Sequence, residues 1–193
     1  MAYSFFAMLS RMKNIRRWAL MRNTRSENIC EHSHEVAVVA HALALLTNRH
    51  YGGQVDSNRC VMLAVYHDVP EILTGDMPTP IKYYNPEIKE AYKKVEIVAN
   101  QKLLEMLPED LRPDYEPLFI HANEDPELLK LLKAADKISA LIKCVEEENS
   151  GNKEFSKAKI SITESIKEMK LPEADTFIKE FLPSYGLTID ELN

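Results

Sequence analysis

The residues with the clearest chemical potential are His67 and Asp68, an imidazole and a carboxylate that follow the apolar run VMLAVY at residues 61–66. This run predicts a buried helix. If the helix continues, side chains three or four positions apart share one face, and Glu71 joins the pair. Burial of these polar groups is unfavourable unless something neutralises them, and a divalent cation would do so. The spacing therefore predicts a metal site at the end of a buried helix.

The chain immediately after Glu71 is rich in residues that end helices. Gly75, Pro78 and Pro80 follow it closely. Glycine permits the backbone angles that end a helix, and proline cannot continue the helical hydrogen bonding. We therefore expect Asp76 in a loop at the rim of the site.

Two further potential ligands lie far from this stretch in the sequence. His32 comes just before the apolar helical pattern of residues 33–48, and Asp136 lies within the helical pattern of residues 126–148. Asp136 has small and apolar neighbours at helical spacing, so its carboxylate is expected to be buried and to need a partner. That partner is a metal ion or, alternatively, Lys133 or Lys137 in a salt bridge.

The histidines near His32 are weaker ligand candidates. His34 lies two positions beyond His32, which on a helix turns its side chain about 200° away, so one ion cannot bind both. We take His32 as the ligand and assign His34, His41 and His50 to packing or to the surface.

Basic side chains gather near the N-terminus of an acidic protein. The net charge is −6, which argues against general nucleic-acid binding. No acidic residue precedes Glu27, whereas six basic residues do, namely Arg11, Lys13, Arg16, Arg17, Arg22 and Arg25. Such a cluster suits a small anionic ligand, and a solvated helix face or a presequence is the alternative. Trp18, the only tryptophan, is interpreted as an aromatic anchor for the first helix or as a wall of a ligand pocket.

The elements that must position these residues are helices. The sequence has five glycines, 45% hydrophobic residues and almost no alternating β-branched runs. Helical patterns cover residues 4–14, 33–48, 86–107, 126–148, 153–169 and 173–182. We therefore predict an all-α protein, and its 193 residues most simply form a single domain.

The cysteines and the hydropathy pattern indicate the compartment. Cys30, Cys60 and Cys144 are widely spaced, form no CxxC motif and are typical of reduced cysteines. The sequence shows no signal-peptide pattern and no apolar run of membrane-spanning length. We expect a cytoplasmic protein with no membrane partner.

Several short motifs resemble one known family. They are RRW at residues 16–18, RSENI at 25–29, EHS at 31–33, YHD at 66–68 and EILTGDMPTP at 71–80. Together with the H…HD…D set of His32, His67, Asp68 and Asp136, they are similar to the YfbR-like 5′-deoxynucleotidases, which are HD-domain phosphohydrolases. The similarity runs nearly end to end. TGDMPTP after the HD pair, with EHS before it, is far more specific than an HD dipeptide alone.

The resemblance implies a helical HD-domain bundle that hydrolyses deoxyribonucleoside 5′-monophosphates to deoxynucleoside and phosphate. It implies one divalent transition metal ion (cobalt, manganese, iron or zinc), a metal-activated water as nucleophile, and a homodimer. The implied metal ligands are His32, His67, Asp68 and Asp136, and the implied acid/base group is Glu71. The implied nucleotide contacts are Arg17, Trp18, Thr74 and Asp76.

Three details of this expectation concern single residues. Pro70 stands where the family often carries a small helix former, and it should loosen or kink the turn that holds Asp68 and Glu71. Asp76 either binds the sugar hydroxyl or caps the loop beside Gly75. A preference for deoxynucleotides is expected to come from crowding at the sugar 2′ position, with Trp18 as the wall.

Two other functions remain as alternatives. The first is an HD-type phosphohydrolase that acts on another nucleotide. Alarmone pyrophosphohydrolases carry Glu-Asp shortly after the HD pair, whereas Ile72 follows Glu71 here, which counts against that substrate. The second is a non-catalytic binding module in which the metal only stabilises the fold. Such a module would need no open coordination position.

Overall fold

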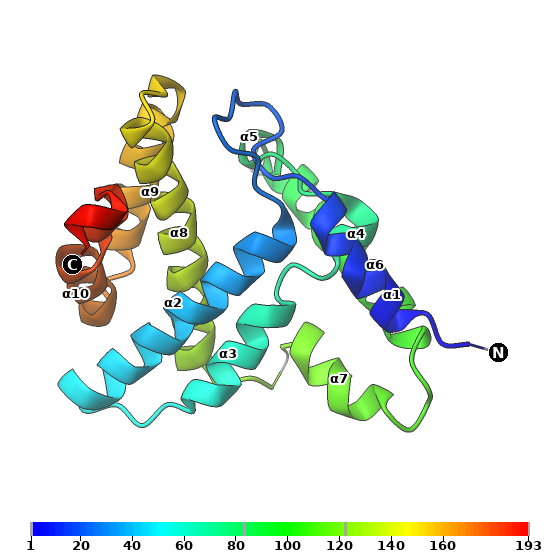
Figure 1. Ribbon diagram of the computed structural model, residues 1–193. Coiled ribbons are helices and arrows are strands. Elements are labelled where there is room, and N and C mark those ends of the chain that lie inside the picture. Colours follow the sequence, from blue (N-terminus) through cyan, green and yellow to red (C-terminus); the bar gives the residue numbers. More distant parts are fainter. Residues whose placement is uncertain (1, 83, 122, 193) are drawn as a thin grey trace. The chain divides into compact units, whose positions relative to one another are not determined.

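The computed structural model describes residues 2–82, 84–121 and 123–192, which form helices joined by loops (Figure 1). No strand occurs among these residues, which contain one isolated antiparallel bridge between Arg16 and Asn28. The α-helices are α1 (Phe5–Leu9), α2 (Ile29–His50), α3 (Ser57–Tyr66), α4 (Glu71–Thr74), α5 (Thr79–Lys82), α6 (Pro86–Glu105), α7 (Arg112–Phe119), α8 (Pro126–Asn149), α9 (Ser156–Glu168) and α10 (Pro172–Glu180). The 3-10 helices are η1 (Ser10–Asn14), η2 (Lys153–Phe155), η3 (Leu182–Gly186) and η4 (Ile189–Glu191). The prediction of an all-α protein is confirmed.

Local sequence signals set the start of the long helices α6 and α8. Asn85 Oδ1 accepts a hydrogen bond from Ile88 N at 2.7 Å, and a proline begins α6. Asp125 Oδ1 likewise accepts one from Glu127 N at 2.8 Å, and a proline begins α8. This combination is favoured because the first helical residue needs no N–H, while the following N–H groups need an acceptor. The helices predicted at residues 86–107 and 126–148 therefore agree closely with α6 and α8.

The chain divides into two compact units. Unit 1 comprises Met1–Met21, Ser26–Ser33 and Val65–Glu124, and unit 2 comprises Arg22–Arg25, His34–Ala64 and Asp125–Asn193. Each unit has its own cluster of buried apolar side chains. The single domain inferred from chain length stays a prediction.

The core of unit 1 combines side chains of the short helices α1 and α7 with leucines at the end of α6, and several of its members are aromatic. Phe5 on α1 is fully buried, and its ring centre lies 5.2 Å from that of Tyr115 and 6.0 Å from that of Phe119, both on α7. Phe119 also meets Tyr66, the last residue of α3, edge to face at 5.7 Å. Such pairs stabilise a core beyond their apolar burial. They fix the end of α3, from which the chain enters the turn that carries His67.

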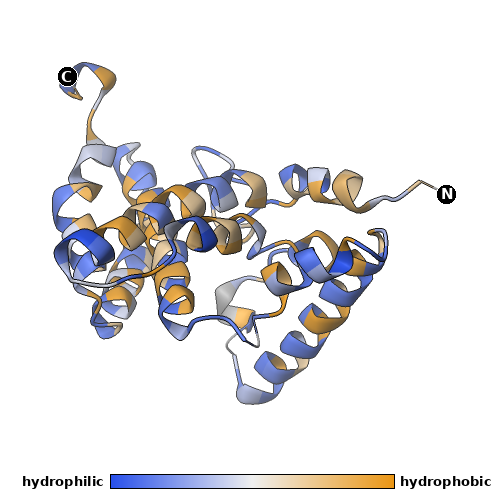
Figure 2. Ribbon diagram, turned by 90° about the horizontal axis from the view of Figure 1, so that it is seen from below, coloured by the Kyte–Doolittle hydropathy of each residue, from blue (hydrophilic) through white to orange (hydrophobic). Residues whose placement is uncertain are grey.

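The core of unit 2 is formed by longer helices with one apolar side. Figure 2 shows hydrophobic and hydrophilic residues following one another along the helices of the chain. The buried side chains come largely from α2 and α8 and include Val36, Val39, Leu43, Leu131, Ile138 and Ile142. Within the described residues, no helix combines the length and apolar character needed to cross a bilayer.

Candidate metal and nucleotide site

His67 and Asp68 lie in a tight turn rather than in a helix. α3 ends at Tyr66, α4 begins at Glu71, and Glu71 N donates a hydrogen bond to Asp68 O, three residues back, at 3.0 Å. The predicted continuous helix through Glu71 is therefore wrong. Pro70 explains the break because proline has no N–H to donate and its ring clashes with the preceding turn of an α-helix. Its effect on this segment is the one expected from the sequence.

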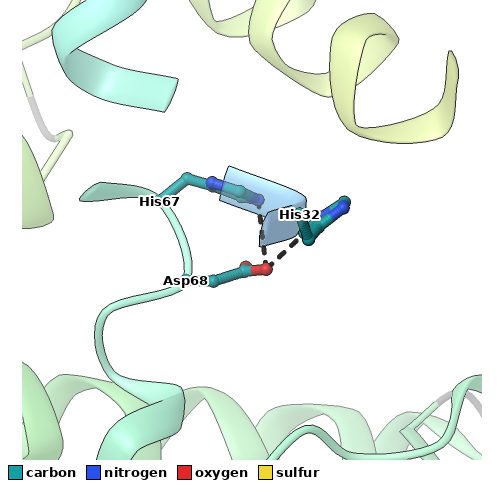
Figure 3. Close-up of side chains that lie close together, drawn as sticks. All are labelled: His32, His67 and Asp68. Atoms are coloured by element: carbon teal, nitrogen blue, oxygen red, sulfur yellow. Dashed lines mark ion pairs between the residues drawn. The ribbon is translucent and has the colours of Figure 1, made fainter. Parts of the chain in front are cut away.

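The turn brings His67 and Asp68 together with His32, which comes from the first turn of α2 (Figure 3). The Nε2 atoms of both histidines face Asp68 Oδ2, at 3.1 Å for His67 and 3.5 Å for His32. One ligand atom from each side chain lies within 4.8 Å of the other two. Atoms that each bind one metal ion at about 2.0–2.2 Å are roughly 3–4 Å apart. The three side chains therefore fit a single divalent ion after a small adjustment.

The charges around Asp68 favour a cation site. Burial disfavours the ionised carboxylate, but the neighbouring His67, His32 and Arg17 favour it more strongly, so the pKa of Asp68 lies well below its usual range. Asp68 is therefore an anionic oxygen donor at neutral pH. With two imidazoles it forms the mixed nitrogen and oxygen set that several transition metals accept.

His32 is fully buried at the start of α2. The other histidines considered on this helix, His34, His41 and His50, are exposed. Of the two roles expected for them, packing or the surface, the structure shows the surface. Only His32 among them is brought to Asp68 by the described structure, so the choice of His32 over His34 agrees with the geometry.

Arg17 and Trp18 adjoin His32 through a carboxylate that they share. Arg17 Nη1 lies 2.8 Å from His32 Nδ1 and donates a hydrogen bond to Glu27 Oε1 at 3.0 Å. Trp18 Nε1 donates a hydrogen bond to Glu27 Oε2 at 2.8 Å. The guanidinium lies 5.8 Å from the centre of the indole ring, within the range of a cation–π contact. Two of the predicted nucleotide contacts therefore lie next to a predicted metal ligand.

Glu71 is buried at the start of α4. Its Oε2 atom has no hydrogen-bond partner within the part of the chain that the structure describes. Burial, and then the negative charges of Asp68 and Asp76, raise the pKa of Glu71 to about 9, although Lys82 and Arg17 act in the opposite direction. In the metal-free protein this carboxyl group therefore holds a proton at neutral pH.

The segment after α4 carries the other two predicted nucleotide contacts, Thr74 and Asp76. Asp76 lies in a loop, as predicted. Gly75 separates the two residues and has a φ of 74°, a conformation that residues with a Cβ rarely adopt. Tyr92 on α6 holds this segment because its hydroxyl lies 3.1 Å from Thr74 Oγ1 and 3.3 Å from Gly75 O. Burial raises the pKa of Asp76, against the positive charge of Arg17.

Asp136 lies on α8 in unit 2 and is half-buried. Lys137, one of the two lysines considered as its salt-bridge partner, donates a hydrogen bond to Ser165 Oγ at 2.9 Å. The part of Asp136 in the metal ligand set stays a prediction.

Sequence reasoning missed three side chains near these residues. The signal for Glu27 was present, because it is the first carboxylate after the arginine cluster and lies within the RSENI motif. Lys82 and Tyr92 had no local signal. Lys82 Nζ lies 3.0 Å from Glu96 Oε1 and 4.8 Å from the centre of the Tyr92 ring. Burial acts against its charge, but Glu96 outweighs burial and raises the pKa of Lys82.

Comparison with known proteins assigns the chain to a family by sequence. A family model described as 5′-deoxynucleotidase YfbR-like matches residues 4–185. A protein of Vibrio vulnificus named 5′-deoxynucleotidase is 51% identical over 189 residues, which cover 98% of this chain and 97% of that protein. A 5′-deoxynucleotidase of Vibrio cholerae is 50% identical over the same shares of the two chains.

Solved structures agree on the fold. An HD-domain phosphohydrolase from Listeria innocua matches with a TM-score of 0.83 at 25% identity, covering 94% of this chain and 88% of that one. The HD phosphohydrolase DatZ of cyanophage S-2L, solved with dA and one catalytic zinc ion, matches with a TM-score of 0.68 at 20% identity. It covers 92% of this chain and 96% of its own, and at this identity it shows the fold alone. The chain has the HD-domain fold and belongs to the YfbR-like 5′-deoxynucleotidase family.

Proposed function

We propose that this protein hydrolyses deoxyribonucleoside 5′-monophosphates to deoxynucleoside and phosphate, with a metal-activated water as nucleophile. The observation that carries the proposal is the convergence of two imidazole Nε2 atoms on Asp68 Oδ2 in a chain of this family. Relatives that are about half identical over nearly the whole chain bear the name 5′-deoxynucleotidase. The function therefore has support from both the chemistry of the side chains and the family.

The residues proposed to hold the metal are His32, His67, Asp68 and Asp136. A bound divalent transition metal ion supplies Lewis-acid polarisation of the phosphate and a water of lowered pKa. Cobalt, manganese, iron and zinc all accept a mixed histidine and carboxylate set, so each is a proposed cofactor. Two histidines and two carboxylates would hold the ion while leaving it able to bind a water and a phosphate oxygen.

The nucleotide is proposed to contact Arg17, Trp18, Thr74 and Asp76. A guanidinium is suited to the phosphate because its parallel N–H groups bind two oxygens at once. Asp76 is proposed to accept a hydrogen bond from a sugar hydroxyl. Its loop position next to Gly75 leaves its carboxylate close enough to influence the ionisation of Glu71. This proximity to Glu71 supports a role for Asp76 in the same nucleotide site.

Glu71 is proposed as the acid/base group. Its burial and the absence of a hydrogen-bond partner for Oε2 among the described residues leave this oxygen available to a substrate or a water. It would donate a proton to the leaving 5′-oxygen or accept one from the attacking water. Phosphoryl transfer depends mainly on positioning and charge stabilisation, so few further groups are needed.

The test is phosphate release from a panel of 5′-monophosphates, both ribo and deoxy. We expect release from dAMP and dTMP that EDTA abolishes and that Co²⁺ or Mn²⁺ restores. Asp68→Asn should abolish it, whereas Asp110→Asn, at an exposed carboxylate, should leave it unchanged. Release that persists in EDTA, or no release from any 5′-monophosphate with any of the four metals, would contradict the proposal.

Trp18 is proposed as the wall that crowds the sugar 2′ position and so favours deoxynucleotides. The half-buried indole is held in place by its hydrogen bond to Glu27. We expect a higher kcat/KM for dAMP than for AMP, and a smaller ratio in Trp18→Ala. Equal values for dAMP and AMP in the native protein would rule this role out.

We also propose that the protein is a cytoplasmic homodimer. The family resemblance supports both statements. Size-exclusion chromatography coupled to light scattering measures the mass of the protein in solution. Twice the mass of one chain is expected, and the mass of one chain would contradict it.

A further inference from the structure

Glu27 makes an unusual number of contacts with one dipeptide. Its backbone carbonyl accepts a hydrogen bond from Arg17 N at 3.0 Å. Its Oε1 accepts one from Arg17 Nη1 at 3.0 Å, and its Oε2 accepts one from Trp18 Nε1 at 2.8 Å. The side chains of Arg17 and Glu27 are both only 12% exposed, so their ion pair is screened less than a surface pair. Glu27 therefore fixes both side chains of the dipeptide and part of its backbone.

The dipeptide needs such support because its backbone is strained. Trp18 has a φ of 57°, in the left-handed region that bulky residues rarely occupy. A conformation of this kind persists only where surrounding contacts enforce it. The bridge between Arg16 and Asn28 brings the two chain segments together, and the contacts of Glu27 lie directly beside it. The orientation of Trp18 thus depends on Glu27 rather than on its own backbone preference.

Glu27 also lies beside His32. Its Oε1 atom is 3.6 Å from His32 Nδ1, and Arg17 Nη1 contacts both of these atoms. When a histidine binds a metal through Nε2, its Nδ1 carries the ring hydrogen and donates it to a neighbouring acceptor. Arg17 has only donors, so its 2.8 Å contact makes Nδ1 the acceptor in this structure, and Arg17 cannot accept the ring hydrogen that metal binding would place on Nδ1. Glu27 Oε1 is the nearby carboxylate oxygen that can, once its 3.6 Å distance to Nδ1 shortens to that of a hydrogen bond.

We propose that Glu27 is a positioning residue that serves the nucleotide contacts and the metal ligand together. It holds Arg17 toward the phosphate and Trp18 toward the sugar, and it accepts the Nδ1 hydrogen bond of His32 when a metal ion is bound. The inference rests on the proposed function for the identity of the nucleotide and the metal. The link between Glu27, the dipeptide and His32 is independent of that identity.

The test compares Glu27→Gln with wild type and with Glu31→Gln, which removes an exposed carboxylate from the first turn of α2, next to His32. The first readout needs neither metal nor substrate. Trp18 is the only tryptophan, so its fluorescence in EDTA reports directly on its contact with Glu27. We expect acrylamide to quench it at least twofold more efficiently in Glu27→Gln and unchanged in Glu31→Gln.

The second readout is the affinity of the protein for Mn²⁺ alone, measured by calorimetry. Loss of a carboxylate behind a ligating histidine weakens metal binding by about 10–100-fold. We expect a loss of that size in Glu27→Gln and none in Glu31→Gln. The third readout is kinetic. With saturating metal, KM for dAMP should rise by more than kcat falls, because the variant misplaces Arg17 without removing a reacting group.

Coupling between residues separates positioning from a general role in the fold. If Glu27 acts through Arg17, then Glu27→Gln should add less than twofold to the KM of Arg17→Ala. A residue that only stabilises the fold would give additive effects. Unchanged quenching and unchanged Mn²⁺ affinity in Glu27→Gln would overturn the proposal.

Failure of this proposal differs from failure of the proposed function. The latter would appear as a wild-type protein that releases no phosphate, with the quenching result still informative. Circular dichroism checks that each variant folds. If Glu27→Gln does not fold, Glu27→Asp replaces it, because this variant keeps the charge but shortens the side chain. Quenching, Mn²⁺ affinity and kinetics are then measured on Glu27→Asp. Wild-type values throughout for Glu27→Asp would then count against a positioning role.

Discussion

Glu71 combines burial with an ionisable group, and this combination affects stability as well as chemistry. In the unfolded chain its pKa takes the ordinary value of 4.5, and in the metal-free fold burial and its acidic neighbours raise it to about 9. Between these two pH values the folded state holds a proton that the unfolded state has released. The free energy of unfolding therefore falls as the pH rises through this window.

Glu71→Gln keeps the shape of the side chain but cannot ionise. The variant should therefore lack the fall in the free energy of unfolding that the wild type shows as the pH rises. In EDTA at pH 8 we expect the variant to be more stable than wild type by on the order of 1 kcal/mol or more. The difference should shrink toward pH 4, because there both states of the wild type are protonated at this position. Urea unfolding at the two pH values measures it.

The activity of Glu71→Gln tests the proposed acid/base role separately from stability. Loss of the acid/base group should lower kcat by about 10²–10⁴-fold, while Glu90→Gln, at an exposed position on α6, should leave it unchanged. A stability difference that does not depend on pH would mean that folding leaves the ionisation of Glu71 unaltered.

For single residues, the sequence predicts which side chains belong to the site better than it predicts which side chains they contact. His32, His67 and Asp68 were recognisable because imidazoles and carboxylates are costly to bury unpaired, and the fold brings them together. Glu27 was not assigned a role. Its contacts depend on the bridge between Arg16 and Asn28, which no periodicity predicts. The ligand role of Asp136 stays a prediction.

The helices themselves were largely predictable, because apolar periodicity and capping residues are local signals. The errors lie between helices. The chain after Tyr66 was predicted to stay helical, yet it turns at residues 67–70. The short helix α5 was not predicted, because four residues cannot show a helical period.

Tyr92 offers a test of how one helix supports the loop after α4. Its hydroxyl contacts Thr74 Oγ1 and Gly75 O, and Tyr92→Phe removes both contacts while keeping the ring. We expect a stability loss of about 1 kcal/mol, the usual contribution of a hydrogen bond. KM for dAMP should rise by roughly threefold to tenfold, with kcat changed less.

The matched control is Tyr84→Phe, since the Tyr84 side chain is 78% exposed. Thermal unfolding and steady-state kinetics on the two variants provide the comparison. Equal KM values in both would show that the loop keeps its position without the Tyr92 hydroxyl.

Glu147 on α8 holds the segment Arg22–Arg25 in unit 2. Its carboxylate accepts hydrogen bonds from Thr24 N at 2.9 Å, Thr24 Oγ1 at 2.7 Å and Asn152 Nδ2 at 2.8 Å, and it pairs with Lys143. Burial opposes its charge, but Lys143, Thr24 and Asn152 outweigh burial and lower the pKa of Glu147 from 4.5 to about 2.

Because the folded pKa is lowered, the stabilisation from Glu147 is present above pH 4.5 and is lost as the pH falls toward 2. Glu147→Gln should be less stable than wild type by a few kcal/mol at pH 7. The two proteins should converge near pH 2. Urea unfolding midpoints of the two proteins, measured between pH 7 and pH 2, test this. A stability difference that stays constant with pH would contradict the lowered pKa of Glu147.

Metal binding should stabilise the molecule as a whole. An ion that binds only the folded state raises the free energy of unfolding by about 2.7 kcal/mol at one hundred times its dissociation constant. For a chain of this length that corresponds to a rise in Tm of roughly 5–10 °C. Calorimetric scans of EDTA-treated protein, with and without added Mn²⁺, measure the shift.

His67→Ala should abolish that rise, and His34→Ala, at an exposed histidine outside the cluster, should retain it. A similar shift in His67→Ala would mean that the stabilising ion binds elsewhere.

At the scale of the whole chain, the fold class and the family were accessible from the sequence, because composition and spaced motifs extend over its full length. The division into two units was not. Two of its boundaries fall within α2 and α3, where the helical pattern continues without interruption. A helix that contributes to two cores has the same periodicity as a helix that contributes to one.

Pro70 affects both the rate and the affinity with which the site binds a metal ion. Its ring limits the backbone of the turn in the unfolded chain as well as in the native one, so folding leaves fewer alternative conformers around His67 and Asp68. Two adjacent donors on such a rigid turn lose little conformational entropy when they capture an ion. Pro70→Ala would then slow the capture of Mn²⁺ in stopped-flow mixing, even where the helices on either side stay intact.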